Sequence, residues 1–81
     1  MEERRKTNTS KFLSLILRHQ PAEYGLVLEA NGWAPVADVL NACTKHGHAV
    51  TWNELEDIVE TNEKKRFSFD ESGDRIRANQ G

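Results

Sequence analysis

The chain has 81 residues, of which 37% are hydrophobic and 30% are charged, and its formal net charge is −2. These values indicate one small folded domain, and they exclude both a disordered chain and a deep cleft between two domains. No apolar stretch is long enough to cross a bilayer, and the single cysteine, Cys43, excludes an internal disulfide. We therefore expect a cytoplasmic protein with no membrane partner.

The charges are segregated along the chain. Residues 1–22 carry a net charge of +3, residues 23–63 carry −7 and residues 64–81 carry +2. Because both ends are basic, we expect an anionic partner to meet the ends of the chain rather than its middle. The alternative is that these charges belong to an ordinary solvated surface, which is the commoner case for a run of charged residues.

The first expected element is a helix. Residues 1–9 are polar and predict a flexible terminus, and Thr9 or Ser10 can cap a helix that runs to about His19. The apolar residues of this helix share one broad face: Phe12, Leu13, Ile16 and Leu17. Arg18 should then reach solvent, with His19 at the edge of the apolar face.

Two more helices are expected in the middle of the chain. Before these two helices, the apolar residues 26–28 predict a short strand. An apolar stripe predicts the second helix, which ends at Gly47: Val36, Val39, Leu40 and Cys43. Thr51 and Glu54 have the spacing of a capping box, which opens a third helix that ends near Asn62.

The last segment predicts a β-hairpin. Residues 66–69 and 75–78 alternate polar and apolar side chains, and residues 70–74 form a turn. If the strands pair, Arg66 and Arg77 share the outer face with Arg75. The expected fold is therefore α+β: a small winged-helix-like domain of three helices and a C-terminal β-hairpin, over residues 10–81.

The charges of the third helix argue against the usual DNA-binding mode of such a domain. In a helix-turn-helix protein this helix enters the major groove. Here it carries several carboxylates and no Lys or Arg, and carboxylates are repelled by phosphates. We interpret its acidic side chains as a solvated outer face.

The basic residues at both ends favour a phosphate site instead. Arg18 and Arg66 can each offer a planar fork of donors to phosphate oxygens, and His19 can donate a hydrogen bond or carry a proton. Lys64 and Lys65 add positive charge. The simpler alternative for Arg18 and His19 is that positive groups favour a helix C-terminus.

Two other residue groups suggest sites but have simpler explanations. Cys43, His46 and His48 resemble zinc ligands, but Cys43 falls on the apolar stripe and a fourth ligand is not evident, so no metal is expected. Trp33 and Trp52 could stack on nucleobases, yet each adjoins a helix start, which favours a packing role.

Four segments resemble one known family. They are residues 10–19 (SKFLSLILRH), 31–33 (NGW), 58–67 (IVETNEKKRF) and 75–81 (RIRANQG). Together they resemble the N-terminal lobe of the RNA 2′-phosphotransferases, the tRNA 2′-phosphotransferase type that is called KptA in bacteria. The resemblance covers nearly the whole chain from Ser10 onward, in the same order and with similar spacing.

The resemblance implies a two-lobe, NAD-dependent enzyme. An RNA 2′-phosphate attacks the nicotinamide ribose of NAD and expels nicotinamide, and the adjacent ribose hydroxyl then attacks the phosphorus. This second attack breaks the bond between the phosphorus and the RNA, so the RNA leaves with a 2′-hydroxyl and ADP-ribose 1″,2″-cyclic phosphate is the other product. The N-terminal lobe faces the RNA, and the C-terminal lobe holds NAD.

The resemblance also implies roles for individual residues. The family's catalytic Arg-His pair maps onto Arg18 and His19, and a further catalytic Arg maps onto Arg66. Contacts with the RNA backbone are expected from three more residues: Lys64, Lys65 and Arg77.

The chain departs from the family pattern in its length, because the family continues into a second lobe and this chain ends at Gly81. We therefore expect a monomeric, isolated lobe without turnover, with RNA that carries a 2′-phosphate as its partner and with at best a weak affinity for phosphate or RNA. The alternative is a non-catalytic winged-helix module that binds nucleic acid or a protein.

Overall fold

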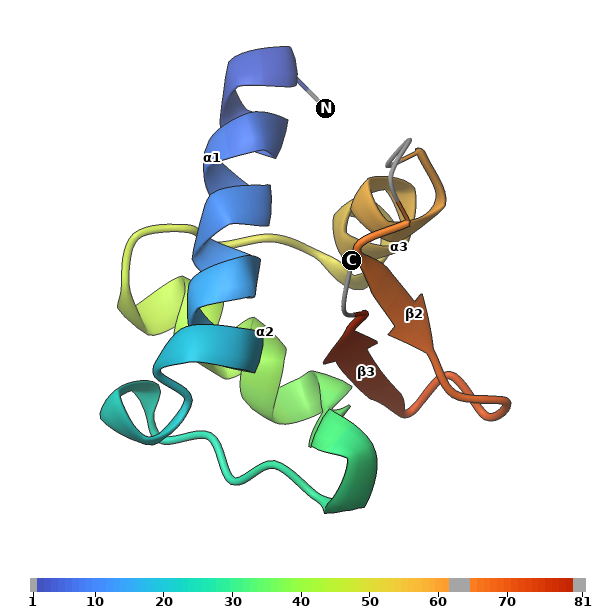
Figure 1. Ribbon diagram of the computed structural model, residues 1–81. Coiled ribbons are helices and arrows are strands. Elements are labelled where there is room, and N and C mark those ends of the chain that lie inside the picture. The colour runs from blue at the N-terminus through green and yellow to red at the C-terminus, as the bar shows by residue number, and fades with distance from the viewer. Residues whose placement is uncertain (1, 62–64, 80–81) are drawn as a thin grey trace.

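Three helices and a small sheet form the fold in the computed structural model, which describes residues 2–61 and 65–79 (Figure 1). Helix α1 spans Glu3–Ser14, α2 spans Val36–Lys45 and α3 spans Trp52–Thr61. Strands β1, β2 and β3 span Ala34–Pro35, Phe67–Phe69 and Arg75–Ala78. The α+β class expected from the sequence is confirmed.

Helix α1 begins at Glu3, so the expected start at Thr9 or Ser10 is wrong. The reason is tertiary: Arg5 and Lys6 of α1 pair with carboxylates of α3, and Thr9 is buried. These contacts hold turns that have little apolar surface of their own. The flexibility of residues 1–9 stays a prediction, although α1 runs across that boundary.

The helix continues into a wider turn, η1, which spans Leu15–His19. The backbone N–H of Gln20 donates to the carbonyl of Leu15 at 2.8 Å, so this hydrogen bond spans five residues instead of four. Such π-type turns often occur at functional sites. Ile16 and Leu17 stay buried within it, as the helical wheel predicted.

Two short 3₁₀ turns connect η1 to the sheet, η2 at Ala22–Tyr24 and η3 at Ala30–Gly32. The strand expected at residues 26–28 is wrong, because that segment is irregular and the side chain of Val27 is 80% exposed. The place beside β3 is taken by Ala34 and Pro35 of β1 instead. A proline fits there because β1 is an edge strand, where its missing N–H costs no ladder bond.

The sheet is antiparallel with the order β1-β3-β2, so the predicted hairpin forms two of its three strands. Phe67 pairs with Ala78, Ser68 with Arg77 and Phe69 with Ile76. This register places Phe67 and Ile76 in the core and turns Arg77 to the outer face, as the alternation predicted.

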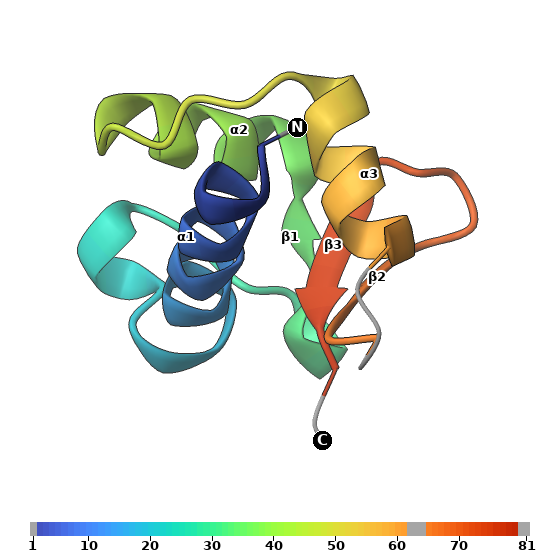
Figure 2. The same cartoon turned by 90° about the horizontal axis from the view of Figure 1, so that it is seen from above.

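One hydrophobic core joins the helices to the inner face of the sheet. Its buried members come from every major element: Phe12, Leu13, Ile16, Leu17, Leu26, Ala34, Val36, Val39, Ala42, Cys43, Val50, Leu55, Ile58, Val59, Phe67 and Ile76. Figure 2 shows the same elements from above, with α1 at the left, the strands in the middle, and α3 at the right beside β2.

The predicted capping box at the start of α3 is confirmed. The N–H of Thr51 donates to Glu54 Oε1 at 3.0 Å, and the N–H of Glu54 donates to Thr51 Oγ1 at 3.1 Å. Two backbone donors that the helix itself cannot satisfy are thereby satisfied.

Replacing Thr51 by alanine is expected to destabilise the domain by about 1 kcal/mol, because it removes the cap acceptor of α3. Urea unfolding of Thr51→Ala and Thr51→Ser measures this, and serine should retain most of the stability. Thr44→Ala is the matched control, since the Thr44 hydroxyl donates only to the carbonyl of Leu40 within α2. An equal loss in both alanine variants would contradict the capping role.

Candidate phosphate-binding site

Arg18 and His19 lie at the end of η1 and both are exposed. Their backbone is anchored because the preceding residues, Ile16 and Leu17, are buried in the core. The helical wheel placed His19 at the edge of the apolar face, and its side chain is exposed in the structure. Two polar side chains are thus held on a rigid element and directed to solvent.

The second basic segment lies directly before β2. Lys65 and Arg66 are both exposed, and Lys65 has a left-handed backbone with φ +49°. Lys64 lies outside the described residues, so its predicted contact with RNA stays a prediction. The backbone carbonyl of Arg66 accepts a hydrogen bond at 2.6 Å from the N–H of Asn79, the residue that follows β3.

Arg77 contributes from β3. Its guanidinium carbon lies 4.9 Å from the ring centroid of Trp33, which is a cation–π distance. Its Nε is buried and has no hydrogen-bond partner among the described residues. The sequence assigned Trp33 to packing, and the structure shows that it packs under a proposed RNA contact.

The fold brings these segments together. η1 contacts β3, and all three residues of β2 pair with β3. In Figure 2 the end of the first helical segment, the end of β3 and the start of β2 all lie along the lower edge of the view. We call this surface the basic end and define it by five residues: Arg18, His19, Lys65, Arg66 and Arg77.

Three cations outside the basic end are paired with carboxylates, namely Arg5, Lys6 and Arg75, whereas Arg4, Lys11 and Lys45 make no ion pair among the described residues. Arg75 contacts Glu29 at 2.8 Å and Asp70 at 3.5 Å, and Arg5 contacts Glu54 at 2.5 Å. Within residues 2–61 and 65–79, no ion pair involves a residue of the basic end. Its positive charge is therefore available to an anion.

The acidic helix α3 is not simply a solvated face, so that interpretation needs correction. Arg5 of α1 binds both carboxylate oxygens of Glu54, and Lys6 of α1 lies 3.7 Å from Asp57. Arg5 and Lys6 therefore pair with two of the four carboxylates of α3 and do not join the basic end. This distinction could not be made from charge counts along the chain.

The carboxyl of Glu54 has a pKa below its ordinary value of 4.5, because the N–H of Thr51 and the guanidinium of Arg5 stabilise the charged form. A pKa that is lower in the folded state stabilises the fold above the unfolded-state pKa, and this contribution is lost as the pH falls through the folded-state pKa.

Stability should therefore fall as the pH is lowered from about 5, and Glu54→Gln should make this fall shallower. Urea unfolding across this range measures it. Glu60→Gln is the control, because Glu60 is exposed on the same helix and makes no ion pair in the described part of the chain. Wild-type pH dependence in Glu54→Gln would refute the assignment.

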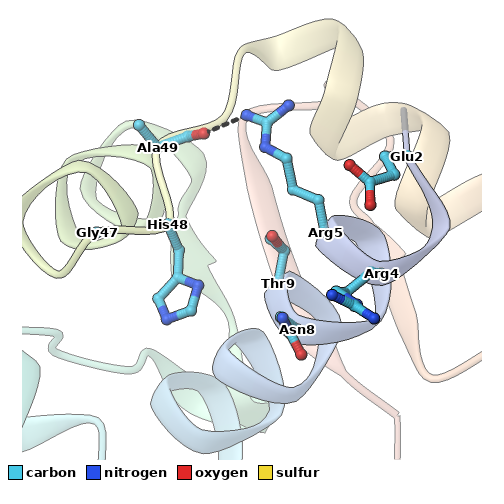
Figure 3. A pocket seen from close by; sticks show the side chains of 8 residues that line it. All are labelled: Glu2, Arg4, Arg5, Asn8, Thr9, Gly47, His48 and Ala49. Atoms are coloured by element: carbon cyan, nitrogen blue, oxygen red, sulfur yellow. Dashed lines mark hydrogen bonds between the residues drawn. The ribbon is translucent and has the colours of Figure 1, made fainter.

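A separate cleft of about 330 Å³ lies at the other end of α1 (Figure 3). It is formed by the first two turns of α1 and the 47–49 segment, and Arg5 Nη2 donates to the carbonyl of Ala49 across it at 2.6 Å. Its lining residues are Glu2, Arg4, Arg5, Asn8, Thr9, Gly47, His48 and Ala49. None of the residues expected to bind a phosphate or RNA lines it, although His48 was considered as a zinc ligand and Thr9 as a helix cap.

The possible zinc ligands are engaged in packing. Cys43 is buried, and burial raises the pKa of its thiol to about 11, so the thiol is protonated at neutral pH. The ring of His48 stacks on Phe12 with 4.5 Å between centroids. Over the described ranges 2–61 and 65–79, no three His, Cys, Asp or Glu residues are grouped to hold a metal ion.

None of the helices in the described part of the chain has the length and apolar character needed to cross a membrane.

Comparison with known proteins gives a consistent result. A family model described as "RNA 2′-phosphotransferase, Tpt1 / KptA family" matches residues 4–81. Similar proteins from Trichormus variabilis and Herpetosiphon aurantiacus are each 49% identical over 81 residues, which is all of this chain and 44% of each relative. One from Streptomyces griseus is 47% identical over 88 aligned positions, covering 47% of that relative.

All three relatives are named probable RNA 2′-phosphotransferase. The chain spans less than half of the length of these relatives.

Proposed function

The chain belongs to the RNA 2′-phosphotransferase, Tpt1 / KptA family, and from this premise we propose that it forms the RNA-facing lobe of an NAD-dependent enzyme. The lobe receives the 2′-phosphate of an RNA, such as a tRNA, at the basic end. The observation that supports this proposal is that η1 contacts β3 and that β2 pairs with β3, so the segments that carry the cations of the basic end adjoin one another. None of these cations makes an ion pair among the described residues.

Arg18 and Arg66 are the residues proposed to hold the 2′-phosphate. Each guanidinium can donate two parallel hydrogen bonds to phosphate oxygens, and two forks from different elements fix the direction of the phosphate. Holding the reacting groups in one orientation lowers the entropic part of the barrier. The same charges stabilise negative charge that develops on the phosphate oxygens.

His19 is proposed to donate a hydrogen bond to the phosphate or to assist proton transfer. Lys64, Lys65 and Arg77 are proposed to contact the RNA backbone. These three contacts would position the RNA without reading its sequence.

NAD would supply the ribose carbon that accepts the phosphate and would lose nicotinamide, and ADP-ribose 1″,2″-cyclic phosphate would be the final product. Binding of NAD is proposed for the part of the relatives that this chain does not span. A monomeric state and a cytoplasmic location stay predictions.

A winged-helix classification is part of the proposal. The element order α1-β1-α2-α3-β2-β3 and the sheet order β1-β3-β2 support it. The carboxylates of α3 do not favour insertion of that helix into a DNA groove. The second candidate is a non-catalytic winged-helix module that binds nucleic acid or a protein. It ranks second because these carboxylates disfavour the usual contact of such a module with DNA.

An NMR titration tests the proposal against this alternative. One RNA oligonucleotide is prepared with a single internal 2′-phosphate and without it. We expect larger shifts for the phosphorylated RNA, centred on Arg18, His19 and Arg66. Equal shifts with both RNAs would overturn the proposal, and shifts along α3 with duplex DNA would favour the second candidate.

The chain alone is expected not to turn over, because it spans less than half of its relatives and NAD binding is assigned to the rest. Incubation with NAD and the 2′-phosphorylated RNA, followed by assay of nicotinamide, measures this. Release of nicotinamide that depends on the RNA and stops in Arg18→Ala would contradict the expectation.

A further inference from the structure

The backbone around Arg66 has an unusual conformation that something must maintain. Lys65 has φ +49°, a left-handed value that residues with a Cβ adopt at a cost in free energy. Arg66 follows directly and is exposed, so its own side chain does not hold it in place by burial. Other contacts must therefore fix this short segment before β2.

Asn79 supplies those contacts. Its side-chain Nδ2 donates to the carbonyl of Lys65 at 2.7 Å and to Ser68 Oγ at 2.7 Å. Its backbone N–H donates to the carbonyl of Arg66 at 2.6 Å. The carbonyls of Lys65 and Arg66 belong to the two peptide groups that flank the Cα of Arg66, so one residue anchors both of them.

The chemistry of the site favours a short side chain with two donor hydrogens at position 79, as an asparagine amide has. A carbonyl can only accept a hydrogen bond, so the nitrogen of the Asn79 amide, not its oxygen, must face Lys65. The amide nitrogen carries two hydrogens, and the second one serves Ser68. A carboxylate has no such donor, and a glutamine would extend one methylene further.

We propose that Asn79 is a positioning residue for Arg66: it fixes the backbone on both sides of Arg66 and so the direction of the guanidinium. This inference rests on the proposed function, in which that guanidinium binds the 2′-phosphate. Asn79 itself need not touch the phosphate. A displacement of about 1 Å at such a group can reduce the rate or affinity by about a hundredfold.

The first test measures the backbone directly, without RNA. Asn79→Leu keeps the approximate shape of the side chain and removes both amide donors without changing the charge. The NMR order parameter of the Arg66 amide should fall from about 0.85 to below about 0.6, while core amides stay rigid. Asn41→Leu is the matched control, because Asn41 is exposed on α2.

The second test is a double-mutant cycle with the 2′-phosphorylated RNA oligonucleotide. Asn79→Leu should weaken binding about tenfold in the wild-type background and leave it nearly unchanged in Arg66→Ala, because the two residues act as one unit. Equal weakening in both backgrounds, or a rigid Arg66 amide in Asn79→Leu, would overturn the inference.

The two tests also separate this inference from the proposed function. If the wild-type chain does not prefer the 2′-phosphorylated RNA, the proposed function fails. The relaxation measurement, which contains no RNA, then decides by itself whether Asn79 holds Arg66.

Discussion

Arg66→Lys is expected to weaken binding of a 2′-phosphorylated RNA about 10- to 100-fold and to leave binding of the unmodified RNA nearly unchanged. Lysine keeps the positive charge but loses the planar fork of donors that matches two phosphate oxygens. A charge-assisted hydrogen bond contributes about 1.5–3 kcal/mol, which corresponds to this loss. Fluorescence anisotropy with the two matched oligonucleotides measures both affinities.

Arg75→Lys is the matched control for this prediction. Arg75 lies on the same hairpin and is also exposed, but its guanidinium is engaged by Glu29 and Asp70. We expect its affinity for the phosphorylated RNA to change less than about twofold. If both variants lose affinity equally, the effect is one of general charge, and Arg66 has no special role.

Arg18→Lys extends the prediction to η1. If Arg18 and Arg66 hold one phosphate from two directions, the loss of binding free energy in the double variant should differ from the sum of the losses in the two single variants. Additive losses would indicate two separate anion contacts on the basic end.

Leu13→Ala is expected to lower the free energy of unfolding by about 3 kcal/mol. Leu13 is 0% exposed and lies in α1, which leads directly into the turn that carries Arg18 and His19. A domain of this size has a total stability of about 4–12 kcal/mol, so the loss is a large fraction of it. Urea unfolding followed by circular dichroism measures the change.

Val27→Ala is the control for the core prediction, because it also shortens an aliphatic side chain but at a position that is 80% exposed. Its effect should stay within about 0.5 kcal/mol. A loss of several kcal/mol at Val27 would show that this side chain is covered in solution, and a small loss at Leu13 would contradict its place in the core.

Neighbouring residues were enough to predict several parts of this protein. The capping box at Thr51 and Glu54 depends on residues three positions apart, and the hairpin faces depend on simple alternation. The apolar face of the first helix follows from its periodicity. Arg18, His19 and Arg66 were identified as candidates because they stand out locally and match motifs of the family, but their roles stay predictions.

The tertiary structure decided what depends on partners far along the chain. Helix α1 starts at Glu3 because Arg5 and Lys6 form ion pairs with carboxylates of α3, about fifty residues further along the chain. Among the described residues, Ala34 and Pro35 pair with the edge of β3 that β2 does not occupy, and they form the third strand, β1.

The same reason explains the candidate site. Composition showed which residues are basic, but not which of them are already paired with carboxylates. Arg75 and Arg77 are two positions apart on one strand, yet the first is held by Glu29 and the second lies over Trp33. No local sequence pattern links Asn79 to Arg66, because the hydrogen bonds between the two segments form only when β2 and β3 pair. Local patterns thus determined the elements and the candidate residues, and long-range contacts decided which cations remain available to an anion.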